Sequence, residues 1–98
     1  MSRLRISNAA RADLLDIWTY VAENNGDAAD HLIDEITTTF QTLLGHPKMG
    51  RRRDEFDAPI RSFPVRKYVI YYRLRDDGIE IYRVYHSARD VERLSRHE

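Results

Sequence analysis

Apolar residues in the first half of the chain recur at the spacing of an α-helix. After Ser7 they are separated by four, three and four positions, at Ala10, Leu14, Ile17 and Val21. This spacing puts them on one face of an amphipathic helix, and serine is a residue type that caps the first N–H groups of a helix. Three more apolar residues widen the stripe: Leu15, Trp18 and Ala22. The helix is therefore expected to contact more than one neighbour, or a partner chain.

A second helical pattern follows a turn at residues 24–26, where Gly26 is expected to end the first helix. Asp27 is then expected to cap the second helix. Its buried face consists of apolar residues at helical spacing: Ala29, Ile33, Ile36, Phe40 and Leu43. Gly45 and Pro47 end this helix. The first half of the chain thus predicts an αα-hairpin.

The second half of the chain is rich in the aromatic and β-branched residues of β-strands. Residues 61–65 predict a short strand that Pro64 keeps at a sheet edge or a bend. Residues 68–75 and 79–85 predict a hairpin whose turn is Asp77-Gly78. A two-residue loop there pairs Leu74 with Ile81, Ile70 with Tyr85, and Arg75 with Glu80 as an ion pair. The face expected to pack on the helices carries Ile70, Tyr72, Leu74, Ile79 and Ile81.

Shorter segments complete the predicted fold. Residues 3–6 alternate between arginine and apolar side chains and predict an N-terminal strand. The polar residues 46–58 predict a loop. Ser87 begins a capping-box pattern, which predicts a short helix over residues 88–94. The sequence therefore predicts one α+β domain over residues 1–98, with an N-terminal strand, an αα-hairpin packed on a small twisted antiparallel β-sheet, and a short C-terminal helix.

Composition narrows the class of protein. The 98 residues carry 16 basic and 16 acidic side chains, so the overall charge indicates neither a nucleic-acid-binding protein nor a protein of the membrane surface. Residues 1–46 hold three basic and seven acidic residues, a net charge of −4, and residues 47–98 hold thirteen and nine, a net charge of +4. The lack of cysteine excludes disulfides and thiolate chemistry. The sequence has no apolar stretch of membrane-span or signal-peptide length, so we expect a cytoplasmic protein. We also expect that the protein uses no cofactor.

Few side chains indicate chemistry by their spacing alone. Arg51, Arg52 and Arg53 form the most basic run, which either binds phosphate or an acidic protein, or is a solvated segment balanced by acidic neighbours. His86 ends the last predicted strand and is either a general acid or base, or a histidine held by hydrogen bonds at a corner. The four histidines lack metal-ligand spacing, so no metal site is expected. Trp18 belongs either to the core or to a partner surface.

Several short motifs, spread along the chain in one order, say more than spacing does. They comprise Ala12, Asp13, Leu14, Asp16, Ile17, Tyr20, Pro47, Gly50, Arg51, Arg61, residues 68–73, Ile81, Arg83, Val84, His86, Arg89 and Asp90. The most specific part is the RVxHxxRD pattern of residues 83–90. Together these motifs resemble the ParE branch of the RelE/ParE toxin superfamily. The resemblance implies a helical hairpin against a small twisted antiparallel sheet, as the periodicity does.

The superfamily holds two functions on one scaffold, so the fold cannot choose between them. ParE-type members poison DNA gyrase, trapping its cleaved complex with DNA, and RelE-type members are ribosome-dependent mRNA endonucleases. Ser87 and Ala88 stand where such a nuclease carries its acid or base, and residues 68–72 are apolar or aromatic where it tends to carry an arginine. The resemblance therefore favours a gyrase poison without catalytic activity. The alternative, a nuclease, would use His86, Arg83, Arg73 and Tyr85.

The resemblance also implies two protein partners. One is a ParD-like antitoxin, whose C-terminal segment would wrap the toxin in a hetero-oligomer and contact the widened apolar stripe at Leu15, Trp18 and Ala22. The other is DNA gyrase, through which any contact with DNA would be indirect. The basic half of the chain is expected to contact gyrase through Arg51, Arg52, Arg53, Arg73, Arg83 and Arg89. A third hypothesis keeps the fold without toxicity and leaves a module that only binds the antitoxin.

Overall fold

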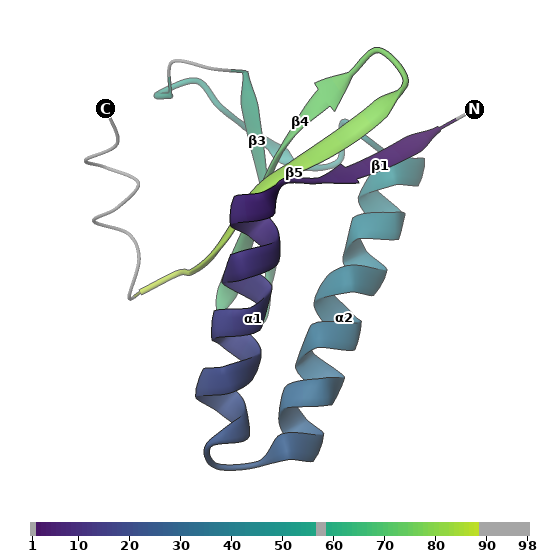
Figure 1. Ribbon diagram of the computed structural model, residues 1–98. Coiled ribbons are helices and arrows are strands. Elements are labelled where there is room, and N and C mark those ends of the chain that lie inside the picture. Colours follow the sequence, from purple (N-terminus) through teal and green to yellow (C-terminus); the bar gives the residue numbers. More distant parts are fainter. Residues whose placement is uncertain (1, 57–58, 89–98) are drawn as a thin grey trace.

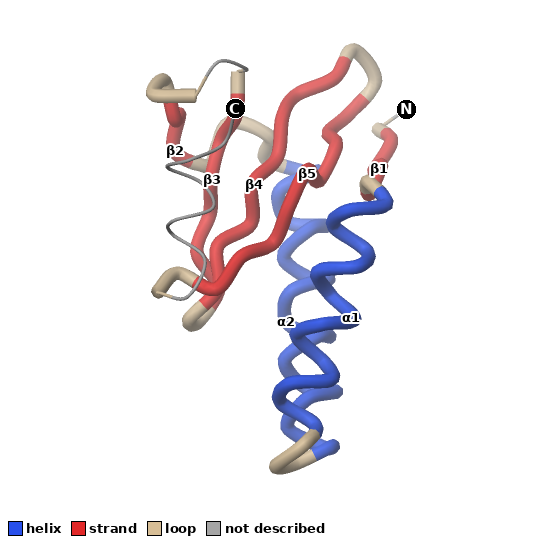
Figure 2. The backbone as a smooth tube through the Cα atoms, turned by 60° about the vertical axis from the view of Figure 1, so that its left-hand side comes forward, coloured by secondary structure: helices blue, strands red, loops and turns tan. Residues whose placement is uncertain are grey.

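Two helices and a five-stranded sheet make up the part of the chain that the computed structural model describes, residues 2–56 and 59–88. In chain order the elements are β1 (Arg3–Ile6), α1 (Asn8–Ala22), α2 (Gly26–Gly45), β2 (Arg51–Arg53), β3 (Ile60–Val65), β4 (Tyr68–Arg75) and β5 (Gly78–His86) (Figure 1). The hairpin of helices covers one face of the sheet (Figure 2), so the predicted α+β architecture is confirmed. The helix predicted over residues 88–94 lies, beyond Ala88, outside the described residues.

The helix ends show one correct and one incorrect cap prediction. The Ser7 side chain accepts a hydrogen bond from the Ala10 backbone N–H at 3.0 Å, as predicted. The second cap is Asn25 instead of Asp27, because the extended Asn25 places its side-chain oxygen 3.1 Å from the Ala28 N–H. The glycine expected to end α1 is the first residue of α2, and Asp27 lies in the first turn, where a carboxylate is favoured by the helix dipole.

The sheet has the strand order β1-β5-β4-β3-β2 and is mixed. Strands β2 to β5 pair antiparallel, as expected, whereas β1 pairs parallel to β5. In this parallel pair Arg3 lies opposite Gly78, and a Cβ atom at position 78 would overlap the Arg3 carbonyl oxygen. Glycine is therefore required where β1 crosses the start of β5.

The β4–β5 hairpin forms, but the predicted turn and register are wrong. The turn is Asp76-Asp77, and Leu74 lies opposite Ile79, while Ile70 lies opposite Val84 because an irregularity between Tyr71 and Tyr72 shifts the register. The Asp77-Gly78 pair predicted the wrong register, because Gly78 is required for the close approach of β1 and does not form the turn. The predicted ion pair of Arg75 with Glu80 does form, at 3.2 Å, although Arg73 is the residue directly opposite Glu80.

The main core lies between the helices and the sheet. Its buried residues are Ala10, Ile17, Ile36, Phe40, Leu43, Val65, Tyr68, Ile70, Tyr72, Ile79, Ile81 and Val84. Four of the five sheet residues expected to pack on the helices belong to this core. The fifth, Leu74, is 39% exposed, because it stands at the hairpin end.

The segment from His46 to Arg53 is more ordered than the predicted loop. The Tyr72 hydroxyl donates to the Pro47 carbonyl at 2.8 Å and accepts from the Gly50 N–H at 2.8 Å. The three arginines that follow form β2, which pairs with residues 60–62 of β3. Because β2 stops there, Pro64 lies in the part of β3 that β2 does not reach, as its ring requires. Neither described helix is long and apolar enough to cross a membrane.

Candidate functional site

The first candidate surface lies on α1. Leu15 is 64% exposed and Trp18 is 38% exposed, whereas Ala22 is half-buried. The Trp18 indole N–H donates to the Asp30 carboxylate of α2 at 2.8 Å. Trp18 is thus held across the two helices with part of its ring in solvent, so it is not a fully buried core residue. Tyr20, 54% exposed, adds an aromatic side chain to α1 that spacing arguments did not select.

A second surface covers the sheet face that points away from the helices (Figure 2). A small apolar cluster lies there and is buried: Ile60, Tyr71 and Tyr85 are 6%, 4% and 7% exposed, and the partly buried Phe56 and Val69 pack against them. Arginines flank it: the Arg53 guanidinium lies 5.4 Å from the Phe56 ring centre, and that of Arg83 lies 4.6 Å from the Tyr85 ring centre. Burial raises the pKa of the Tyr71 phenol, so this group stays protonated near neutral pH.

The basic run of β2 differs in exposure from one residue to the next. Arg51 and Arg52 are exposed, and Arg52 pairs with Asp54 at 3.2 Å in a fully solvated geometry. Arg53 is held more firmly, because it pairs with Glu55 at 2.7 Å and also donates to the Ser62 hydroxyl. The hydrogen bond between Arg53 and Glu55 raises the pKa of Arg53 and lowers the pKa of Glu55.

Arg83 is engaged in the most buried ion pair among the described residues. Its Nε and one terminal nitrogen donate to both oxygens of Asp13 at 2.8 and 2.9 Å, and the Val84 N–H donates to the same carboxylate at 3.0 Å. Asp13 is only 7% exposed, and its hydrogen bonds raise the pKa of Arg83. Asp13 therefore fastens α1 to β5. Its place on the apolar stripe, three residues after Ala10 and four before Ile17, is the sequence signal for a buried charge.

The four residues of the candidate nuclease set are not brought to one point. Arg83 and Tyr85 lie together, but Arg73 donates to Glu80 at 3.1 Å further along the sheet. The His86 ring packs edge-on against Tyr68 of the main core at 5.2 Å, so it lies on the opposite face from the cluster of Tyr85. Its Nδ1 accepts a hydrogen bond from the Ala88 N–H at 3.1 Å. These contacts are of the kind expected for a histidine held by hydrogen bonds at the end of a strand.

Two predictions remain, one that concerns Arg89 and one that concerns a metal site. Arg89 lies outside the described residues. Among residues 2–56 and 59–88, no three His, Asp or Glu side chains gather closely enough to hold a metal ion. The candidate site thus comprises two surfaces, an aromatic one on the helices and the exposed arginines Arg51 and Arg52 on the edge strand β2. The fold that carries them is that of a small α+β domain, with two helices packed on one face of a five-stranded mixed sheet (Figure 2).

Comparison with known proteins gives the family. The protein-family model described as "ParE toxin of type II toxin-antitoxin system, parDE" matches residues 4–91 of this sequence. Toxin ParE1 of Caulobacter vibrioides is 36% identical over 90% of this chain and 92% of its own, and Toxin RelE3 of the same organism is 31% identical over 89% and 96%. A solved chain of the chromosomal ParDE TA system from P. aeruginosa shares the fold, with a TM-score of 0.73 and 21% identity over 88% of this chain and 96% of that one. The chain belongs to the ParE toxin family of type II toxin–antitoxin systems.

Proposed function

We propose that this toxin inhibits DNA gyrase by trapping the cleaved complex of the enzyme with DNA, and that it does so without catalysis of its own. The observation that carries the proposal is the match of the ParE toxin family over residues 4–91. The separation of the candidate nuclease set supports it, because Arg83 is held by Asp13 of α1, whereas Arg73 lies beside Glu80 further along the sheet. The toxin would act in the cytoplasm, where gyrase and DNA are.

A ParD-like antitoxin would neutralise the toxin by direct binding in a hetero-oligomer. The exposed Leu15 and Trp18 on α1 support this part, since a lone chain gains nothing from such side chains in water. Trp18 is already oriented by its bond to Asp30, so binding would cost little side-chain entropy. An amphipathic helix laid along α1 is the mode of recognition that this stripe suits.

The contact with gyrase would use the basic half of the chain. Of the six arginines considered, Arg51 and Arg52 are the exposed pair on the edge strand β2. Arg52 stays 70% exposed although it pairs with Asp54, whereas the ion-paired Arg53, Arg73 and Arg83 are less exposed. We therefore expect Arg51 and Arg52 to contribute most to a contact with the gyrase–DNA complex.

The alternative function is a RelE-like, ribosome-dependent mRNA endonuclease. It is favoured by one specific finding, the relative named Toxin RelE3 at 31% identity. Arg83 beside Tyr85 would then be the place to look for chemistry, with Arg83 as the cation for developing phosphate charge.

A supercoiling assay with the purified toxin tests the proposal. We expect loss of supercoiling by gyrase and accumulation of cleaved DNA. Unchanged gyrase activity together with cleavage of mRNA on ribosomes would assign the RelE-like function instead. Expression of the toxin without its antitoxin tests the third hypothesis, because normal growth would leave only a module that binds the antitoxin.

A further inference from the structure

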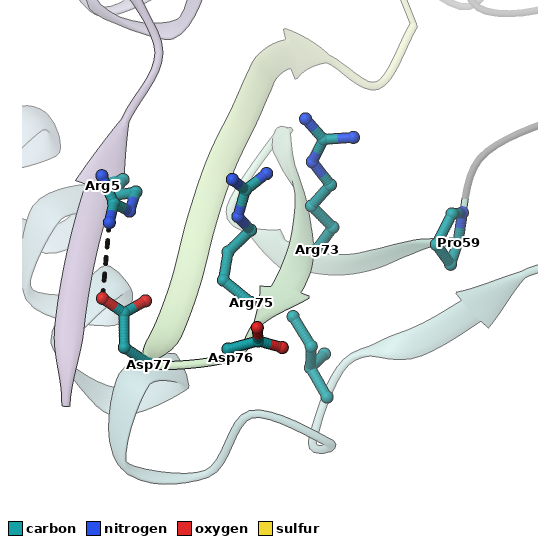
Figure 3. Close-up of a pocket in the computed structure, with 7 residues that line it drawn as sticks. Arg5, Pro59, Arg73, Arg75, Asp76 and Asp77 are labelled. Carbon is teal, nitrogen blue, oxygen red and sulfur yellow. Dashed lines mark hydrogen bonds and ion pairs between the residues drawn. The ribbon is translucent and has the colours of Figure 1, made fainter. Parts of the chain in front are cut away.

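An open hollow of about 570 Å³ lies where β4 turns into β5, at the end of the sheet farthest from the β3–β4 turn (Figure 3). Three arginines line it, Arg5 from β1 and Arg73 and Arg75 from β4. The turn residues Asp76 and Asp77 also line it. Arginines from separate strands meet here because Arg5 and Arg73 both lie opposite Glu80 of β5.

The charges are layered, with a carboxylate beneath the guanidinium groups. Arg73 and Arg75 donate to the same oxygen, Oε1 of Glu80, at 3.1 and 3.2 Å. The Glu80 side chain is 22% exposed and does not line the hollow, whereas those of Arg73 and Arg75 are 36% and 42% exposed and do. A ligand in the hollow therefore meets the guanidinium groups of Arg73 and Arg75 before the Glu80 carboxylate, and the carboxylates that it also meets are those of Asp76 and Asp77 at the turn.

The guanidinium groups keep hydrogen-bonding capacity for a ligand. A guanidinium carries five N–H donors in a planar fork that matches phosphate oxygens. In the described part of the chain, the side-chain hydrogen bonds of Arg73 and Arg75 both go to Oε1 of Glu80. One terminal N–H of Arg5 donates to the Asp77 carboxylate at 3.3 Å. Figure 3 shows the Arg73 and Arg75 guanidinium groups pointing the same way, away from the Asp76 carboxylate.

We propose that this hollow binds a phosphate group, held by Arg73 and Arg75 with Arg5 beside them. The inference concerns this hollow alone and holds whether or not the toxin acts on gyrase. Leu74 and Pro59 add apolar wall, and Leu74 is 39% exposed. This wall suits the carbon atoms of a sugar or base, so a phosphate that belongs to a nucleotide or to a nucleic-acid backbone should bind better than inorganic phosphate.

Titrations followed by NMR of the arginine Nε–H groups test the proposal. The probes are inorganic phosphate, ATP and a short DNA duplex, each added to the full chain at low salt. We expect the signals of Arg73 and Arg75 to shift, and the Arg73→Gln/Arg75→Gln variant to bind at least about tenfold more weakly. Arg66→Gln is the matched control, because Arg66 is 69% exposed, is paired with Glu35, and lies outside the hollow.

Glu80→Gln provides a test of opposite sign. Removing the carboxylate frees both arginines and leaves the hollow more positive, so the affinity should rise about threefold. A purely structural role of this cluster cannot raise the affinity, and this variant also covers the case in which the double arginine variant fails to fold.

Each outcome decides the proposal. Binding of ATP that depends on Arg73 and Arg75 supports it and identifies a free nucleotide as the ligand. Binding of the duplex with the same dependence and with strong weakening by salt supports it and identifies a nucleic-acid backbone. The proposal is overturned if no probe shifts these signals at millimolar concentration, if the double variant binds like Arg66→Gln, or if Glu80→Gln does not bind more tightly.

Discussion

Removal of the Asp13 carboxylate is the perturbation whose effect the structure defines best. This carboxylate is 7% exposed and accepts three hydrogen bonds, two from the Arg83 guanidinium and one from the Val84 N–H. It is the connection between the middle of α1 and the last strand. Asp13→Ala deletes the acceptor of all three bonds and leaves two donor groups, the Arg83 guanidinium and the Val84 N–H, in a partly dry environment.

The magnitude follows from the exposure of those two donors. Breaking a buried ion pair on one side costs about 3–5 kcal/mol when the remaining charge is fully buried. The Arg83 side chain is 26% exposed, so its guanidinium can turn toward water and the cost falls to the lower end. The orphaned Val84 N–H adds about 1 kcal/mol. We expect Asp13→Ala to lower the free energy of unfolding by about 3–4 kcal/mol and the melting temperature by roughly 15 °C or more.

Chemical and thermal denaturation measure this effect, with Glu35→Ala as the control. Glu35 also pairs with an arginine, Arg66, but their side chains are 43% and 69% exposed, so its loss should cost about 1 kcal/mol or less. In a double-mutant cycle, Asp13→Leu with Arg83→Met should recover most of the stability, because apolar side chains replace both charges. A loss below about 1 kcal/mol for Asp13→Ala, or additive single losses, would refute the reasoning.

Three further predictions concern the candidate surfaces. In calorimetric titration, Trp18→Ala should weaken binding of a ParD-like antitoxin about thirtyfold. Trp18→Phe, which loses the hydrogen bond to Asp30, should keep most of the affinity. If Trp18→Ala instead leaves the affinity unchanged and lowers the melting temperature strongly, Trp18 is a core residue. Arg52→Glu should weaken gyrase inhibition and spare antitoxin binding, since the Arg52 side chain is 70% exposed. Adding Arg53→Glu should also lower the melting temperature, because it breaks the firmer ion pair with Glu55. If the double variant inhibits gyrase as well as the wild-type toxin across a range of salt, β2 is excluded as the gyrase contact. A folded His86→Gln variant should stay toxic in a growth assay, because this ring packs at a corner; lost toxicity, with ribosome-dependent mRNA cleavage by the wild-type toxin, would favour the nuclease.

The helices and the hairpin of the sheet were predictable because their signals are local. Each helix has apolar residues at a period near 3.6, and the cap at Ser7 is set by residues within one turn. The strands β4 and β5 are similarly marked by their own aromatic and β-branched content. Where two local signals competed, the prediction failed: Asn25 and Asp27 are both good caps, and only the backbone at Asn25 decides between them.

Features that depend on distant parts of the chain escaped sequence reasoning. The parallel pairing of β1 joins residues 3–6 to residues 78–81, and a four-residue strand carries no sign of so distant a partner. Gly78 reads as a turn residue, yet its role is to let β1 approach. The bond between Asp13 and Arg83 joins residues 70 positions apart. By contrast, the placement of Tyr85 and His86 on opposite faces of the sheet follows from a local rule, because neighbouring side chains alternate along a strand.

If the target binds Arg51 and Arg52 as proposed, the strand order limits how an antitoxin can neutralise this toxin. The aromatic surface lies on α1, which packs on β5, whereas the exposed arginines lie on β2, three strands further across the sheet (Figure 2). A partner that covered only Leu15 and Trp18 would leave Arg51 and Arg52 in solvent, so it would not block a target bound there by occupying the same surface. Neutralisation by occlusion therefore requires a segment that continues from the helices onto the sheet. If a fragment confined to α1 were enough to neutralise the toxin, the target surface would have to lie on the helices as well, and the assignment of gyrase contact to β2 would have to be abandoned.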